Sequence, residues 1–281
     1  MRSTSNPAFR NLPKGNVAYG QYGSNVGFNQ PQGGVPGYGP GQAPAGAADR
    51  PMTVDDVVIK TGMSLGVALL VGVVTAIWAH SQLLVDRFGQ IAGVSGALVG
   101  VLLGGMLVGL GLSLFIIFKQ KASGPLTLAY SAAEGVFLGA ITSVFEVLYP
   151  GIALQAILGT AGVFIAMLVV YKTGAVKVTP KLTKWIIGAT VGVVILMLMN
   201  LLLGAFGVNM GIRDGGPLAI VFSLVVIGIA AFSFLLDFDM ADKMIRQGMP
   251  SKWAWYSAFG LMTTLVWLYL EILRLLSYLR D

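Results

Sequence analysis

Seven apolar runs, each close to the length of a membrane-spanning helix, follow one another along the chain and constrain its fold more than any other feature. A helix of roughly 20 residues crosses the ~30 Å hydrocarbon core of a bilayer. The runs cover residues 58–80, 90–118, 126–148, 151–171, 184–207, 216–238 and 253–278. The sequence therefore predicts an all-α polytopic membrane protein with seven transmembrane helices.

Proline positions support these boundaries. Inside a helix, proline removes a hydrogen bond and clashes with the preceding turn, whereas in the first turn it is tolerated. The five prolines after residue 52 all fall at or just outside the edge of a predicted span: Pro125, Pro150, Pro180, Pro217 and Pro250.

Composition narrows the class of protein. Charged residues make up 11% of the chain, whereas a soluble domain has about 25%, which excludes a soluble enzyme. The absence of cysteine excludes disulfides, thiol catalysis and zinc–thiolate sites, and a single histidine excludes most multi-histidine metal sites. The net charge of +6 is spread between the apolar runs without a dense cluster, so we expect no nucleic-acid partner.

Residues 1–52 differ from the rest in containing 10 glycines and 7 prolines. Such a segment buries too little apolar surface to offset its chain entropy. We therefore divide the chain into a disordered Gly/Pro-rich tail at 1–52 and a seven-helix transmembrane domain at 53–281.

The basic residues predict the orientation. If the tail is cytoplasmic, 14 of the 18 lysines and arginines lie on the cytoplasmic side, as the positive-inside rule requires. We expect a multi-pass protein of the plasma membrane with its N-terminus in the cytoplasm. Seven crossings place the C-terminus outside, and a re-entrant seventh segment would return it inside.

Glycine repeats every four residues in the second span. Gly96, Gly100 and Gly104 form one series, and Gly105 and Gly109 form another. Small residues at this spacing let a neighbouring helix approach closely. We interpret the stripes as packing within one molecule and expect a monomer, with an oligomerisation face as the alternative.

Acidic residues inside the spans are the candidates for function, because a charge near the bilayer centre costs at least ~2.5 kcal/mol. Glu134 lies well inside the third span with no cation on its own helix, and Asp237 ends the sixth. In the seventh span, Glu271 and Arg274 are three residues apart on one face. They form either an intrahelical ion pair or part of a gating relay.

Signs of catalysis are weak. Residues 93–96 spell Gly-Val-Ser-Gly, the nucleophile signature of rhomboid-like proteases, and His80 is expected on the same side. Glycine is so frequent in this span that the string carries little information, and no histidine follows it in a helical motif. We expect no enzyme and no cofactor.

Four motifs stand out in the spans: Glu134–Gly139, Leu154–Phe164, Leu236–Asp239 and Trp267–Leu276. Together they resemble the Bax inhibitor-1 family in its bacterial branch. The resemblance covers residues 55–281 and leaves out the tail.

This resemblance implies a fold whose seventh helix is central and an activity that leaks calcium under control of pH. It also implies a proton-sharing pair of acids on helices six and seven, here Asp237 and Glu271, which are then candidate transient calcium ligands. The resemblance further implies an arginine on helix two that pairs with one of these acids. The predicted second span, residues 90–118, contains no arginine, and Arg274 is a conjectural substitute. If spans six and seven form a straight hairpin, Asp237 and Glu271 are offset by about 15 Å along the helix axes. Three alternatives follow for the proton-sharing pair: it is formed by Asp237 and Glu271, it is formed by Asp237 and Glu134, or it is lost.

We therefore expect a pH-sensitive calcium or cation leak channel or transporter, with calcium as the transported ion. The alternative function is a non-conducting membrane protein that regulates partner membrane proteins or proteases. Ion flux into liposomes distinguishes the two.

Overall fold

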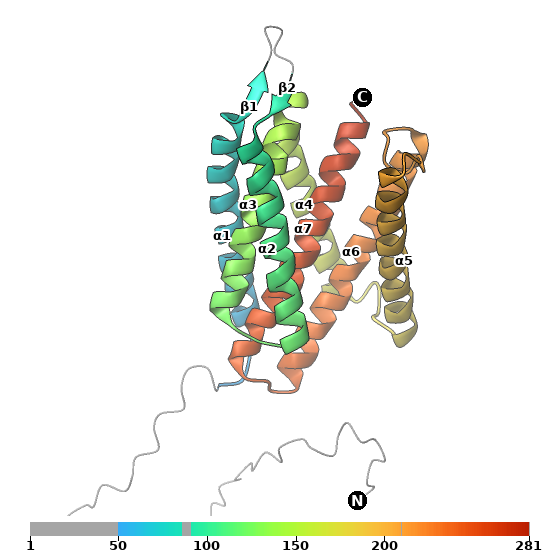
Figure 1. The fold of residues 1–281 in the computed structure, drawn as a ribbon. Coiled ribbons are helices and arrows are strands. Elements are labelled where there is room, and N and C mark those ends of the chain that lie inside the picture. Colours follow the sequence, from blue (N-terminus) through green and yellow to red (C-terminus); the bar gives the residue numbers. More distant parts are fainter. Residues whose placement is uncertain (1–49, 86–90, 209, 281) are drawn as a thin grey trace, which may run out of the picture. The chain divides into compact units, whose positions relative to one another are not determined.

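The computed structural model describes residues 50–85, 91–208 and 210–280, so residues 1–49 of the predicted tail lie outside the described part of the chain. It contains seven helices that are long and apolar enough to cross a membrane, which confirms the predicted fold class. They are α1 (Val54–His80), α2 (Gly96–Lys119), α3 (Gly124–Leu148), α4 (Ile152–Thr173), α5 (Pro180–Ala205), α6 (Pro217–Arg246) and α7 (Ala254–Tyr278) (Figure 1).

Local sequence explains where the helices begin. Thr53, Ser95 and Thr179 each accept a hydrogen bond from a backbone N–H in the first turn of the helix that follows, as N-cap residues do. Pro180 and Pro217 are the first residues of α5 and α6, where the missing N–H of proline costs nothing.

The start of α2 and the end of α6 differ most from the prediction, whereas α1 and α5 each begin four residues earlier than predicted. Strands β1 (Leu83–Val85) and β2 (Ile91–Val94) pair antiparallel, so α2 begins at Gly96 and not at residue 90. Helix α6 continues to Arg246, eight residues past its predicted end at 238. Its last two turns are polar and carry the pairs Asp239–Lys243 and Asp242–Arg246, four residues apart, which stabilise a helix beyond the apolar region.

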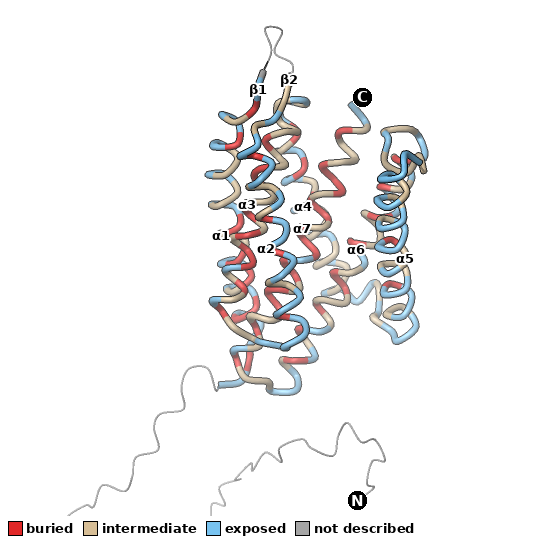
Figure 2. Tube along the Cα trace, in the orientation of Figure 1, coloured by how far each residue is buried: buried red, intermediate tan, exposed pale blue. Residues whose placement is uncertain are grey.

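Helix α7 is central. It packs against α1, α3, α4 and α6, whereas α2 lies mainly on α3, and α5 lies on α6. More than half of the apolar stretch of α7 is buried, against about a tenth of that of α5, and Figure 2 shows this contrast along the two helices. The expectation of a central seventh helix is thus confirmed, with four helices in direct contact and two further out.

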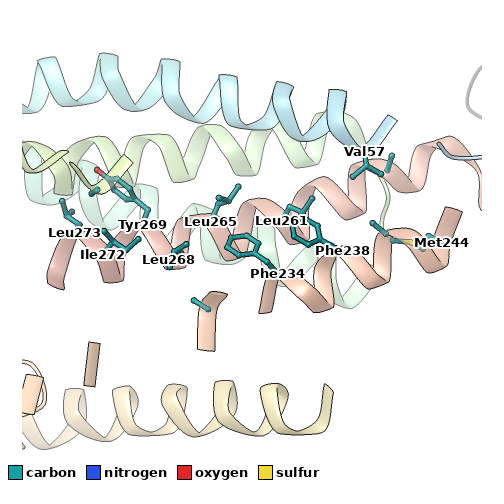
Figure 3. Close-up of a cluster of buried hydrophobic side chains, with 14 of the residues drawn as sticks. Val57, Phe234, Phe238, Met244, Leu261, Leu265, Leu268, Tyr269, Ile272 and Leu273 are labelled. Carbon is teal, nitrogen blue, oxygen red and sulfur yellow. The ribbon is translucent and has the colours of Figure 1, made fainter. Parts of the chain in front are cut away.

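The main core lies between α7 and α6. Phe234 and Leu268 are completely buried and lie in the same cluster as Phe238 and Leu265 (Figure 3). Phe164 of α4 makes edge-to-face contacts with Phe234 and Phe238 at ring-centroid distances of 5.3 and 5.6 Å. These rings fix α4 and α6 against α7.

Glycine allows the closest helix contacts. A Cβ at Gly135 of α3 would lie 2.6 Å from the carbonyl oxygen of Ala68 in α1, and a Cβ at Gly139 would overlap the carbonyl oxygen of Gly72. In α2, Gly105 and Gly109 face α3, so that stripe packs within the molecule as predicted. The other series, Gly96, Gly100 and Gly104, has no atom within 4 Å of its Cβ positions.

Residues 50–52 form a strap across the turn between α6 and α7. The N–H of Met52 donates to Met249 O at 2.8 Å, and the N–H of Ser251 donates to Arg50 O at 2.8 Å. Met52 is only 2% exposed and belongs to the main core. Arg50–Met52, which the predicted division of the chain placed in the tail, therefore pack against the transmembrane helices.

Candidate functional site

Asp237 lies on α6 and faces α7. Its Oδ2 accepts a hydrogen bond of 2.6 Å from Thr264 Oγ1. The other carboxylate oxygen of Asp237 faces Gly260, which lies one turn before Thr264 on α7. A Cβ at Gly260 would lie 3.8 Å from Asp237 Oδ1. No Lys, Arg or His side chain of the described residues forms an ion pair with Asp237. Among the described residues, the carboxyl group of Asp237 is thus held by one hydrogen bond, from the hydroxyl of Thr264.

Glu271 has a different environment. It is 2% exposed, and its Oε1 accepts from Arg274 at 2.9 Å on the same helix. Arg213, from the segment that joins α5 to α6, approaches the same oxygen at 3.5 Å. The ion pair predicted between Glu271 and Arg274 is therefore present, and a second arginine shares it.

Two arginines share the carboxylate of Glu271, and Asp214 lies near the same cluster through Tyr278. Burial lowers the pKa of Arg213, and Arg274 lowers this pKa further while Glu271 raises it. Arginine still keeps its charge in proteins. Tyr278 donates to the carbonyl oxygen of Arg213 at 3.2 Å and ties the segment to the end of α7. In the described part of the chain, Glu271 Oε2 and Arg213 Nε are buried without a hydrogen-bond partner.

Glu134 is on α3, where Gly109 of α2 leaves room for its carboxyl group. A Cβ at Gly109 would lie 2.9 Å from Glu134 Oε1. Tyr130, one turn earlier, interacts with Glu134 and shares a hydrogen bond of 3.2 Å with Thr263 of α7. Glu134 is thus connected to the central helix through a tyrosine.

The structure does not bring Asp237 and Glu271 together. The contact of Asp237 at Thr264 lies seven residues before Glu271, which is about 10 Å along α7, and the buried side chain of Leu268 lies between these two positions. Thr263 and Thr264 are neighbours, however, so the contacts that lead to Glu134 and to Asp237 are at the same level of α7. Asp237 and the tyrosine beside Glu134 thus contact α7 at adjacent residues, whereas Glu271 lies two turns further along.

The sequence analysis missed Arg213 and Thr264, which contact Glu271 and Asp237, and it also missed Tyr130, Thr263 and Tyr278 around them. Nothing in the sequence around Arg213 marks a partner 58 residues away. Thr264 carried a usable signal, because it lies two turns before Glu271 on the same face of α7. Helix α2 has no arginine, so Glu271 is held by Arg213 and Arg274 and not by a latch from that helix.

Two further sequence hypotheses can be compared with the structure. In the described residues no group of three or more His, Cys, Asp or Glu side chains is arranged to hold a metal ion, so a calcium role for Asp237 and Glu271 stays a prediction. The hydroxyl of Ser95 donates to Gln82 Oε1 at 3.1 Å and accepts from the N–H of Leu98 at 3.2 Å. The serine of the Gly-Val-Ser-Gly string is thus the N-cap of α2.

Comparison with known proteins identifies the family. No curated protein and no solved structure matches the chain. A family model described as Bax inhibitor 1 like matches residues 6–281. This match starts 49 residues earlier than the resemblance at 55–281 and includes most of the tail that we had left outside it. Together with the seven apolar helices, it shows that the chain is an integral membrane protein of the Bax inhibitor 1-like family.

Proposed function

We propose that this protein is a pH-responsive pathway for cations, with calcium as the expected ion, in the plasma membrane, and that it is not an enzyme. The observation that carries the proposal is Asp237, whose carboxyl group lies between α6 and α7 and has, among the described residues, the hydroxyl of Thr264 as its one hydrogen-bond partner. The N-terminus is on the cytoplasmic side in this proposal.

An acid in this position can respond to both protons and cations. An ionised side chain inside a bilayer is costly unless a cation or a proton neutralises it. Since no cationic side chain of the described part pairs with Asp237, a proton or a passing metal ion is left to do so. Carboxylate and hydroxyl oxygens are ligands that calcium accepts.

Glu271 has a different role in this proposal. The two arginines beside it repel cations, so a cation path past Glu271 requires that Arg213 and Arg274 move or that the path bypasses them. We assign Asp237, with Glu134 at the same level of α7, to the proton-sensitive part of the path. The Glu271 cluster is then a barrier closer to the end of α7 that carries Tyr278.

Ion flux tests the proposal directly. Purified full-length protein is reconstituted into liposomes that contain a calcium-sensitive dye, and calcium entry is followed between about pH 5 and pH 8, with protein-free liposomes as the control. We expect entry that depends on both protein and pH. If entry equals that of protein-free liposomes at every pH, the protein is non-conducting and the alternative of a regulator of partner membrane proteins takes its place.

A further inference from the structure

Four lysines gather where α4 ends and α5 begins. They are Lys172, Lys177, Lys181 and Lys184. All four are exposed, and in the described part of the chain none of them forms an ion pair. The sequence has no acidic residue between Glu146 and Asp214. On α6, by contrast, both cations of the last turn pair with aspartates. The start of α5 therefore carries positive charge that the described residues do not neutralise.

Two of these lysines share one face of α5 with a tryptophan and a glycine. Lys184, Trp185 and Gly188 follow Lys181 at three, four and seven residues, a spacing that puts all four on one side of a helix. An open groove on this side is lined by Lys184, Trp185, Gly188 and Ala189. Trp185 is 70% exposed, and a Cβ at Gly188 would have no atom of the described residues within 4 Å. This face is thus left open by the described protein.

The open face points away from α6. Helix α5 packs on α6, and its buried residues are Ile186 and Val193, which lie seven apart on one side. At about 100° per residue, Gly188 is turned by roughly 200° from Ile186. Figure 2 shows α5 exposed along most of its length. In a membrane, the lysines, Trp185 and Gly188 therefore face lipid.

The order of these groups along α5 matches a phospholipid with a net negative charge. From the start of the helix inward come Lys181 and Lys184, then Trp185, then Gly188 and Ala189. All lie on one helix, so their order does not depend on how two helices are aligned. Lysine side chains lean toward the start of a helix and extend toward the headgroups, tryptophan favours the headgroup boundary, and the small residues leave room for an acyl chain.

We propose that this face of α5 is a binding site for an anionic phospholipid of the phosphatidylglycerol type. Lys181 and Lys184 donate to the phosphate oxygens, Trp185 lies beside the glycerol esters, and an acyl chain lies over Gly188 and Ala189. The choice of lipid follows from charge: a zwitterionic headgroup brings an ammonium group that the lysines repel, whereas clusters of lysine without acids attract anionic headgroups. The site requires neither ion flux nor a particular orientation of the protein.

Competitive lipid binding tests the site. Delipidated full-length protein is mixed with equal amounts of phosphatidylglycerol and phosphatidylcholine with identical acyl chains, and the bound lipids are counted by native mass spectrometry. We expect phosphatidylglycerol to be retained roughly threefold to tenfold over phosphatidylcholine, since one lysine near an anionic headgroup contributes about a fivefold preference. An excess of soluble glycerol phosphate should not displace the lipid, because it has no acyl chain. Equal retention of the two lipids overturns the proposal, and displacement by glycerol phosphate overturns the assignment to a lipid.

A pair of lysine variants separates this site from general surface charge. Lys181→Gln combined with Lys184→Gln should lose most of the preference. Lys119→Gln combined with Lys121→Gln is the matched control, because these two lysines are also exposed and lie between α2 and α3, at the same end of the helices. The control should keep the preference. An equal loss in both double variants would show attraction to the overall charge of the protein and would overturn the site.

A second pair of variants tests the groove without changing the charge. Gly188→Leu fills it, and we expect the retained phosphatidylglycerol to fall at least threefold. Gly204→Leu makes the same change at the other end of α5 and should have no effect. Both glycines are exposed helix positions with open space around their Cβ positions, and leucine favours helix more than glycine does, so both variants should fold. Unchanged retention in Gly188→Leu overturns the proposed position of the acyl chain and with it the site.

Discussion

Asp237 on α6 accepts a hydrogen bond of 2.6 Å from the hydroxyl of Thr264 on α7, and this bond joins the two helices near the middle of α7. The sequence analysis had paired Asp237 with Glu271, but the two acids have different partners in the structure. Asp237 is connected to the middle of α7, whereas Glu271 lies two turns further along and pairs with arginines. The two acids can therefore be altered separately, with distinct expected results.

The first prediction concerns Asp237. Asp237→Asn keeps the shape of the side chain and its ability to accept from Thr264, but the amide cannot release a proton. If Asp237 is the proton-sensitive group, this variant should lose the pH dependence of calcium flux in liposomes while remaining folded. Asp239→Asn is the matched control: it lies two residues away and pairs with Lys243, and it should keep the pH dependence. Unchanged pH dependence in Asp237→Asn would remove that assignment.

Much of this architecture could be predicted from the sequence, because long apolar helices are encoded by local composition. The seven runs, the prolines at their edges and the acids inside them all lie in continuous segments. The end of α6 was predicted too early because its last turns carry charged pairs that hydropathy does not count as part of a span. The start of α2 was predicted too early because an apolar run can also form a strand. Ile91–Val94 is apolar enough for a span but pairs with Leu83–Val85 as a strand, and hydropathy alone does not separate the two cases.

The candidate site was only partly predictable, for a physical reason. The three-residue spacing of Glu271 and Arg274 fixes their contact, since both lie on one face of one helix. The contact of Glu271 with Arg213 depends on how the segment between α5 and α6 folds back over α7, and no local pattern encodes that. The same holds for glycine: the spacing indicated helix contacts in α2, but the tightest approach is between α1 and α3, at Gly135 and Gly139.

The second prediction concerns Glu271. Glu271→Gln leaves two arginines without their carboxylate, so it should lower the free energy of unfolding by about 3 kcal/mol, the lower end of the range for a broken buried pair, because both arginines stay partly exposed. Adding Arg274→Gln should restore only part of the loss, since Arg213 remains. Adding Arg213→Gln as well should restore more. Thermal unfolding in detergent measures the series, and full recovery with Arg274→Gln alone would show that Arg213 does not share the pair.

The third prediction tests the contact between α1 and α3. Gly139→Ala places a methyl group on the backbone of Gly72, and backbone cannot move aside as a flexible side chain can. We expect a loss of roughly 1–3 kcal/mol in stability, as for other overpacked contacts. Gly100→Ala makes the same chemical change in open space on α2 and should leave the unfolding temperature unchanged. Equal unfolding temperatures for the two variants would contradict this helix contact.

The fourth prediction separates two sides of the membrane by cysteine labelling, which the cysteine-free chain allows. Ser123 and Ala175 are at the end of the helices that we expect in the cytoplasm, and Ser81 is at the other end. Ala175 is preferable to Gly174, whose φ of +67° would strain a cysteine. A membrane-impermeant thiol reagent applied to intact cells should label a cysteine at Ser81 and spare the other two. The reverse pattern would invert the orientation.

The last prediction concerns the strap at Arg50–Met52. From composition alone, deletion of residues 2–50 is expected to leave the fold intact. In the structure, however, Arg50 and Met52 form hydrogen bonds with the turn between α6 and α7. Deleting residues 2–49 should leave the unfolding temperature unchanged, whereas deleting residues 2–52 removes the hydrogen bonds to Met249 and Ser251 and the burial of Met52. Burial of a methionine side chain is worth about 1.5–3 kcal/mol, so the longer deletion should unfold at a lower temperature. Met52→Ala in the full-length chain should reproduce part of this loss without any change in length. Equal stability of the two truncated proteins would show that the strap adds nothing to the packing of α6 and α7.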